Sequence, residues 1–217
     1  MKLLTTLAVL LAAAPAAAGP AIPTSPPARH DRPASEVVIE AGMGAPLGDL
    51  GAHFETEPLG FGAGSGLELG FRWRWYVNRS LSLSPSFHFT DFHGFSGRDP
   101  DFGDYRIDCS TYRYTLELMW RTAPPDASLR PFVAVGAGLF RNRVTGYTKT
   151  FELAFDESVN TLGLTARAGF AVSELEFSVA YHLNRFSTWR YFDTGEDQAY
   201  DWDVIVLRGA WVLPFGD

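Results

Sequence analysis

Nine charged residues stand on the polar sides of segments in which apolar and polar residues alternate, and their types suit ion-pair chemistry. These residues are Glu40, Glu68, Glu117, Glu176, Arg72, Arg74, Arg113, Arg167 and Arg208. If the polar sides line a narrow interior, an unpaired charge there is costly. We therefore expect bidentate pairs between arginine and glutamate that fill the interior. The alternative is a charged conduit for ions, which requires water in the interior.

Other site chemistry finds little support in the sequence. His53, His88 and His93 lack the spacing of a metal site, and no glycine-rich loop leads from a strand into a helix. A single cysteine, Cys109, excludes an intramolecular disulfide. The formal net charge of −7 argues against a nucleic-acid partner. We expect no metal and no cofactor.

The elements that position the charged residues have a period of two, which is typical of strands. In the clearest segment, Leu67, Leu69 and Phe71 share one side while Glu68 and Arg72 share the other. No helix is expected. The eight segments are 37–43, 67–75, 81–89, 112–120, 131–140, 162–170, 177–183 and 205–215. Segment 131–140 is apolar on both sides, and its outward residues are taken to be Val133, Val135 and Leu139.

The connections alternate in length, as they do in a membrane barrel. Long connections are expected at 47–61, 91–105, 145–158 and 187–200, and short ones at 77–80, 122–128 and 173–174. The prediction is an all-β fold: an eight-stranded antiparallel up-and-down transmembrane β-barrel with short periplasmic turns and long extracellular loops. Carboxylates crowd the long connections, which are therefore expected to be acidic.

The N-terminal region indicates export. Lys2 is followed by an apolar run and by Ala16-Ala17-Ala18, a pattern typical of a signal peptide. We expect a signal peptide at 1–18, a proline-rich periplasmic linker at 19–35 and the barrel at 36–217. The expected location is the bacterial outer membrane.

The volume of the apolar side chains indicates which side faces outward. An eight-stranded barrel has an interior just wide enough to be filled by side chains, so the bulky apolar residues must face lipid. Aromatic residues recur where the strands reach the short turns, which predicts an interfacial girdle. Its members are Trp75, Tyr76, Trp120, Phe170, Trp211 and Phe215. A looser second set near the long connections comprises Phe61, Tyr105, Phe140, Phe186 and Trp202.

The stretch Leu129–Phe140 reads Arg-Pro-Phe-Val-Ala-Val-Gly-Ala-Gly near its start. Together with the signal peptide and the alternating strands, it resembles the outer-membrane protein β-barrel superfamily of OmpA/OmpX-type proteins. The resemblance implies a monomer in contact with outer-membrane lipid and lipopolysaccharide, folded by the outer-membrane assembly machinery. It also implies a structural or surface-interaction role, exercised here through the acidic loops.

A second stretch, Tyr181–Thr188, is similar to the catalytic strand of the lipid A 3-O-deacylase family. Aligned on Ser187, Arg185 stands at the position of the catalytic histidine, and a permanently charged guanidinium cannot accept a proton from serine. His182 would lie about 16 Å from Ser187 on the opposite side of the strand, and is expected in the interior near Glu176 or Glu117. We expect no enzyme; a deacylase-like hydrolase and a small porin are the alternatives.

Overall fold

The computed structural model describes residues 35–52, 60–99, 103–124, 127–148, 154–186 and 199–215. The expected signal peptide and almost all of the expected linker lie outside these ranges. None of the helices in the described ranges is long and apolar enough to span a bilayer.

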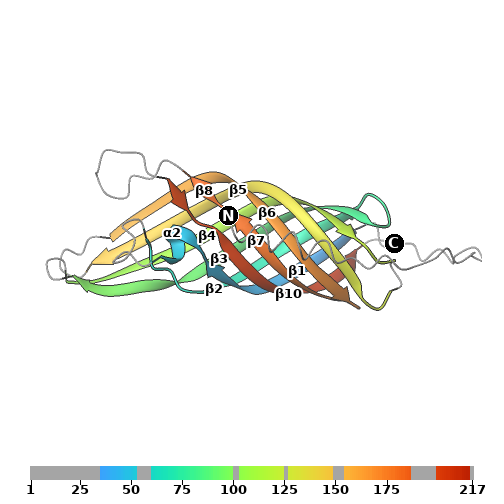
Figure 1. Ribbon diagram of the computed structural model, residues 1–217, viewed down its shortest axis with the longest axis horizontal. Coiled ribbons are helices and arrows are strands. Elements are labelled where there is room, and N and C mark those ends of the chain that lie inside the picture. The colour runs from blue at the N-terminus through green and yellow to red at the C-terminus, as the bar shows by residue number, and fades with distance from the viewer. Residues whose placement is uncertain are drawn as a thin grey trace, which may run out of the picture. The chain divides into compact units, whose positions relative to one another are not determined.

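Eight long antiparallel strands close into a barrel in the order β1-β10-β7-β6-β5-β4-β3-β2 (Figure 1). The strands are β1 (Ser35–Pro46), β2 (Gly66–Tyr76), β3 (Leu81–Asp99), β4 (Gly103–Arg121), β5 (Arg130–Thr148), β6 (Ala154–Val172), β7 (Leu175–Leu183) and β10 (Val204–Phe215). The first and last strands pair along their whole length, from Ser35 opposite Phe215 to Pro46 opposite Val204. This pairing confirms the predicted closure, which leaves no open edge along β1.

Burial alternates along each strand, so the period of two separates an inner side from an outer side. On β2, Glu68 and Arg72 are buried whereas Leu69 and Phe71 are more than half exposed. The apolar residues therefore point away from the barrel axis, as predicted. The outward phase assigned to segment 131–140 is confirmed: Val135 is exposed, whereas Phe132 and its inner neighbours are buried.

The predicted bounds of two long loops, 91–105 and 145–158, are wrong, because the strands continue through most of these residues. The β3–β4 pair extends to Asp99 opposite Gly103, and the β5–β6 pair extends to Tyr147 opposite Ala154. β-branched and aromatic residues still alternate in these extensions, so cross-strand packing maintains the ladder beyond the apolar belt. The two hairpins project past the other strands in Figure 1.

Small elements fold over this end of the barrel. The one-turn helix α2 (Gly48–Gly51) follows β1, although the sequence predicted no helix. Two-residue strands β8 (Arg185–Phe186) and β9 (Tyr200–Asp201) form a separate pair. The short turns at the other end lie at 77–80, 122–129 and 173–174, which agrees with the predicted bounds to within one residue.

Candidate functional site: the barrel interior

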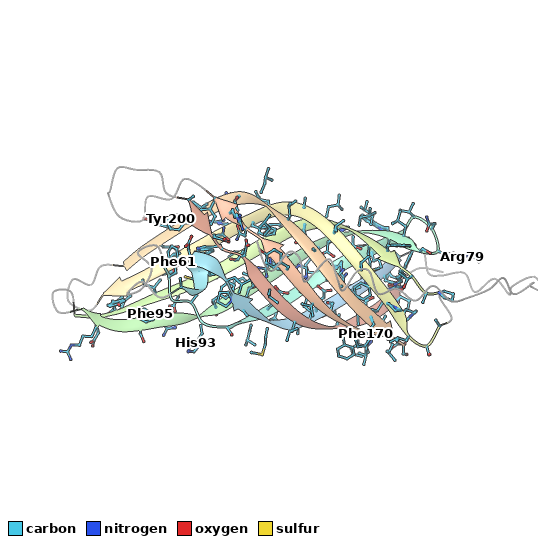
Figure 2. All side chains as sticks on the ribbon, viewed as in Figure 1. Phe61, Arg79, His93, Phe95, Phe170 and Tyr200 are labelled. Carbon is cyan, nitrogen blue, oxygen red and sulfur yellow. The ribbon has the colours of Figure 1, made fainter. Side chains whose placement is uncertain are left out.

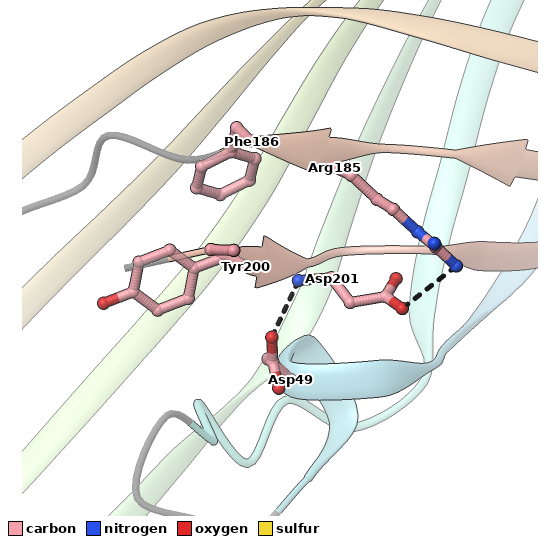
Figure 3. Close-up of a pocket in the computed structure, with 6 residues that line it drawn as sticks. Asp49, Arg185, Phe186, Tyr200 and Asp201 are labelled. Atoms are coloured by element: carbon pink, nitrogen blue, oxygen red, sulfur yellow. Dashed lines mark hydrogen bonds and ion pairs between the residues drawn. The ribbon is translucent and has the colours of Figure 1, made fainter. Parts of the chain in front are cut away.

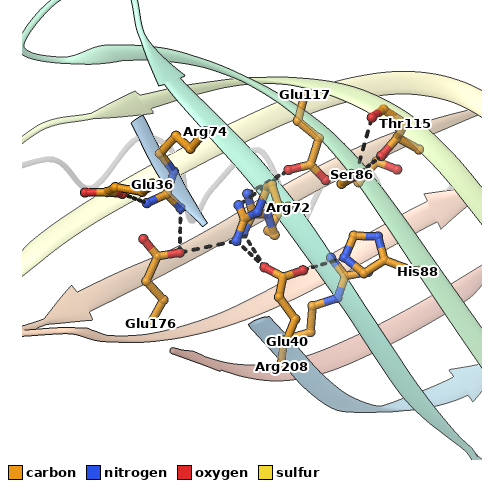
Figure 4. Close-up of polar contacts among 12 residues, drawn as sticks. Glu36, Glu40, Arg72, Arg74, Ser86, His88, Thr115, Glu117, Glu176 and Arg208 are labelled. Carbon is orange, nitrogen blue, oxygen red and sulfur yellow. Dashed lines mark hydrogen bonds and ion pairs between the residues drawn. The ribbon is translucent and has the colours of Figure 1, made fainter. Parts of the chain in front are cut away.

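All nine charged residues singled out from the sequence lie inside the barrel. Each is at most 4% exposed. They arise from inward positions on β1, β2, β4, β6, β7 and β10, so the closure of the sheet brings together residues far apart in the sequence. Figure 4 shows part of this network, in which Glu176 joins Arg74 to Arg72 and Arg72 contacts Glu40. We describe three clusters, from the short-turn end upward.

The lower cluster consists of Glu36, Arg74, Arg121 and Glu176. Arg74 spans the two glutamates, with Nη1 donating to Glu36 at 2.5 Å and Nη2 donating to Glu176 at 2.8 Å. Arg121 donates to Glu176 at 3.0 Å and lies 3.5 Å from Glu36. Two positive and two negative charges therefore balance in this cluster.

The middle cluster consists of Glu40, Arg72, Glu117 and Arg167. Arg72 donates to Glu40 and also reaches down to Glu176 at 3.3 Å. Arg167 donates to Glu117 at 2.7 Å and lies 3.6 Å from Glu40. This cluster is also balanced in charge, and the contact with Glu176 joins it to the lower one.

The upper cluster consists of Glu68, Arg113, Arg208, His88, His182 and Thr90. Glu68 accepts from both Arg113 and Arg208, so one carboxylate faces two guanidinium groups. Arg208 also contacts His182 Nε2 at 2.7 Å. Because guanidinium only donates, Nε2 must accept. We therefore assign the proton of His182 to Nδ1, which lies 2.9 Å from Thr165 Oγ1.

Several features of the interior differ from the sequence-based expectation. The arginines bridge different partners and are not bidentate on one carboxylate; the bidentate pair in the described chain is the exposed Arg143–Asp156. His182 lies against Arg208 and not beside Glu176 or Glu117. His88, which was not among the predicted interior residues, faces inward and contacts Glu40.

Glu36 and Arg121 are interior residues that the sequence analysis missed. Each lies just beyond the end of a predicted segment, at the short-turn rim. Their inward phase continues that of Glu40 and Glu117, and extending each predicted segment by one residue would have found both.

An uncharged layer and an apolar cluster lie above the three charged clusters. Asn142 and Asn184 exchange amide hydrogen bonds of 3.1 and 2.8 Å, and Thr111 donates to Asn142. Above them is the mouth cluster, formed by residues from α2, β9 and the strand extensions. Its buried members are Leu50, Phe61, Ala63, Phe92, Cys109, Val144, Ala180, Phe186, Tyr200, Trp202, Val204 and Val206.

The mouth cluster overturns the second aromatic set. Phe61, Phe186 and Trp202 were expected in a set of aromatic residues near the long connections, but they are buried members of the mouth cluster. Phe140 is buried against His182, and Tyr105 is half-buried. Trp202 packs edge-on against Phe61, with ring centroids 5.3 Å apart, and against Phe186 at 5.7 Å. Figure 2 shows Phe61 and Tyr200 at this end, opposite Phe170.

A shallow pocket of about 370 Å³ borders the mouth cluster, between Asp49, Arg185, Phe186, Tyr200 and Asp201 (Figure 3). Asp49 accepts a hydrogen bond from the Asp201 backbone N–H at 2.7 Å, which ties α2 to β9. Arg185 lies 3.4 Å from the Asp201 carboxylate. Partial burial and the neighbouring Asp203 nevertheless raise the pKa of Asp201 above its ordinary value.

The outer wall at the short-turn end carries the girdle residues. Trp75, Trp120, Phe170, Trp211 and Phe215 are all at least 42% exposed.

Tyr76 is the exception in that set. Its side chain points inward, donates to Glu36 at 2.7 Å and lies under the Arg121 guanidinium. Tyr76 is in phase with Arg72 and Arg74 on the inner side of β2. The alternation of side chains along the strand, and not the aromatic character of Tyr76, therefore decides where its side chain points.

Solved structures share this architecture. Neisserial surface protein A matches with a TM-score of 0.54 at 13% identity, over 84% of this chain and 97% of that one. The attachment invasion locus protein Ail of Yersinia pestis, solved with the heparin analogue sucrose octasulfate, matches with a TM-score of 0.51 at 14% identity, over 84% and 99%. Ail is an outer membrane protein. The chain has the fold of the small outer-membrane β-barrels. No protein-family model and no curated protein matches the sequence.

The outer-membrane barrel fold gives no support to the deacylase-like site. His182 is 1% exposed inside the barrel and is engaged by Arg208, so it cannot meet a lipid on the outer wall. Arg185 pairs with Asp201 and Asp203. Ser187 and Thr188 lie outside the described residues. Within the described ranges, no group of three or more histidine, cysteine or acidic residues could hold a metal ion.

Proposed function

We propose that the protein is a non-enzymatic barrel of the bacterial outer membrane whose lumen is plugged by ion pairs. The contacts of Glu176 carry this proposal. Its carboxylate lies within 3.3 Å of Arg72, Arg74 and Arg121, which come from two different strands on other parts of the wall. Side chains that meet across the bore in this way leave little room for a continuous file of water.

The outer wall supports placement in lipid. Large apolar side chains project outward from the barrel strands, and their exposed fractions reach 82% at Leu162. An apolar band of this extent with an aromatic girdle is typical of membrane barrels and is a liability on a soluble surface. We further propose that the protein is a monomer folded by the outer-membrane assembly machinery, with lipid and lipopolysaccharide around it.

The end with the long hairpins is proposed to face the cell exterior and to carry a structural or surface-interaction role. Carboxylates gather there: Asp49, Asp91, Asp104, Asp156 and Asp201 are all at least partly exposed. Proteolysis of intact cells tests this orientation. Cleavage confined to the regions around 53–59, 100–102, 149–153 and 187–198 is expected, and cleavage within the short turns would contradict it.

Conductance decides between the plugged barrel and a small porin. Purified protein, with insertion verified by heat-dependent migration on SDS gels, should give no steady conductance in planar bilayers. A stable channel with defined ion selectivity would overturn the plug. The deacylase alternative predicts loss of one acyl chain from lipid A on co-expression, and we expect an unchanged lipid A mass.

A further inference from the structure

Among the described residues, the charges in the barrel interior do not balance. Six arginines (Arg72, Arg74, Arg113, Arg121, Arg167 and Arg208) face five glutamates (Glu36, Glu40, Glu68, Glu117 and Glu176). The lower and middle clusters are neutral, each with two charges of either sign. The surplus positive charge therefore lies in the upper cluster, where Glu68 alone faces Arg113 and Arg208.

Neither histidine of the upper cluster supplies a negative charge. His182 is neutral, because Nε2 accepts from Arg208. His88 Nε2 donates to Glu40, which already faces Arg72 and Arg167. Asp203, directly before β10, is the next buried carboxylate toward the mouth, but it lies five residues before Arg208, roughly 17 Å along an extended chain, and contacts Arg185.

Buried N–H donors without a partner among the described residues occur on all six interior arginines, so the charge surplus singles out the upper cluster and its free donors supply the ligands. Arg208 Nη1 and Arg113 Nε are buried and have no hydrogen-bond partner among the described residues. Both side chains are only 1% exposed. A guanidinium that is buried, short of a counter-charge and left with a free N–H is strongly unfavourable.

We propose that the upper cluster binds one small monovalent anion, of the halide or nitrate class, between Arg208 and Arg113. The anion accepts from Arg208 Nη1 and Arg113 Nε and neutralises the surplus charge. The Asn142–Asn184 layer and the mouth cluster lie above the site, so the ion is held in the folded protein and released on unfolding. Such an ion is a structural ligand that stabilises the barrel without passing through it.

Unfolding of the purified full-length chain in detergent tests the site, with sodium bromide compared against sodium gluconate at equal ionic strength. Above its dissociation constant, bromide should raise the folded-to-unfolded ratio roughly tenfold for each tenfold rise in concentration. Arg208→Gln removes the surplus charge and should abolish the dependence on bromide. Arg121→Gln is the matched control: it removes the same charge from the lower cluster and should retain the dependence.

Crystals soaked in bromide give a readout that needs no variant. An anomalous peak within hydrogen-bond distance of Arg208 Nη1 is the expected result. The proposal is wrong if that position shows only water, or if Arg208→Gln and Arg121→Gln respond to bromide equally.

Discussion

Single carboxylates inside the barrel face several partners each, and Glu176 is one of them. Its carboxylate faces Arg72, Arg74 and Arg121, and it is 1% exposed. Replacing it leaves buried guanidinium groups without their counter-charge. We expect Glu176→Ala to lower the free energy of unfolding by about 3–5 kcal/mol, the range seen when one member of a buried pair is removed.

Urea unfolding followed by tryptophan fluorescence measures this loss. Glu174→Ala is the control, since Glu174 lies two residues earlier on the exposed rim, and it should change stability by less than about 0.5 kcal/mol. Equal effects of the two substitutions would mean that the ion pairs around Glu176 do not stabilise the fold.

Asp201 allows a prediction on pH at the mouth of the barrel. Its pKa is raised above 3.8 by burial and by Asp203, so the folded state binds this proton more tightly than the unfolded state does. Stability at the mouth should therefore rise as pH falls through the folded pKa. Asp201→Asn mimics the protonated form and should add up to about 1 kcal/mol at neutral pH, a gain limited by partial exposure.

Hydrogen exchange of the Trp202 amide reports this effect, because that amide donates to the Asn184 carbonyl at 2.8 Å. Exchange should slow in Asp201→Asn at pH 7, and the difference from the unsubstituted protein should vanish in acid. Asp156→Asn should give no such protection, since Asp156 is held by Arg143. Faster exchange in Asp201→Asn would show that the attraction between Asp201 and Arg185 is stronger than the repulsion between Asp201 and Asp203.

At the scale of the strands, the period of two was enough to predict which side chains face the interior and which face outward. It assigned the inner glutamates and arginines correctly, because a shift of one residue would bury every leucine and expose every charge. Strand ends were less accurate: Glu36 and Arg121 lie beyond the predicted segments, and β3 to β6 continue through two expected loops. Pairing partners, not local residue type, decide where a ladder stops.

The mouth cluster could not be predicted from any one segment. Phe61, Trp202 and Phe92 come from three separate regions and meet only when α2 and β9 fold over the barrel end. Their aromatic character suits an interfacial girdle equally well. Non-local packing therefore decided their direction, whereas the inward direction of Tyr76 follows from the local alternation of β2.

The lipid-facing side of β4 provides a test of membrane placement. Leu116 is half exposed and lies five residues before the short-turn end of β4, whereas Leu129 lies in the short turn that precedes β5. In lipid vesicles, Leu116→Arg should cost about 2–4 kcal/mol and Leu129→Arg about 0–1 kcal/mol, because the penalty for arginine depends on depth. If both changes stay within about 0.5 kcal/mol of zero, the outer wall meets water and the barrel is soluble.

At the scale of the whole molecule, the interior is closed in two chemically different ways. Ion pairs occupy the half near the short turns, and an apolar cluster occupies the end with the long hairpins. The two depend on different elements, since the ion pairs are carried by the barrel strands and the apolar cluster needs α2 and β9. A substitution that disrupts the ion pairs should therefore leave the apolar cluster in place, and the reverse should also hold.

Trp202→Ala separates the two closures. Trp202 is fully buried, and removing a buried aromatic side chain costs about 3–5 kcal/mol, which should fall on the packing of α2 and β9. Hydrogen exchange in these elements should accelerate, while the strands stay protected. Trp211→Phe, on the outer wall, is the control and should leave the exchange of α2 and β9 unchanged.

Conductance in planar bilayers should remain absent in Trp202→Ala, because the charged clusters lie below the mouth cluster and still fill the bore. A steady channel in that variant would assign the closure to the mouth cluster and leave the ion pairs lining a water-filled bore.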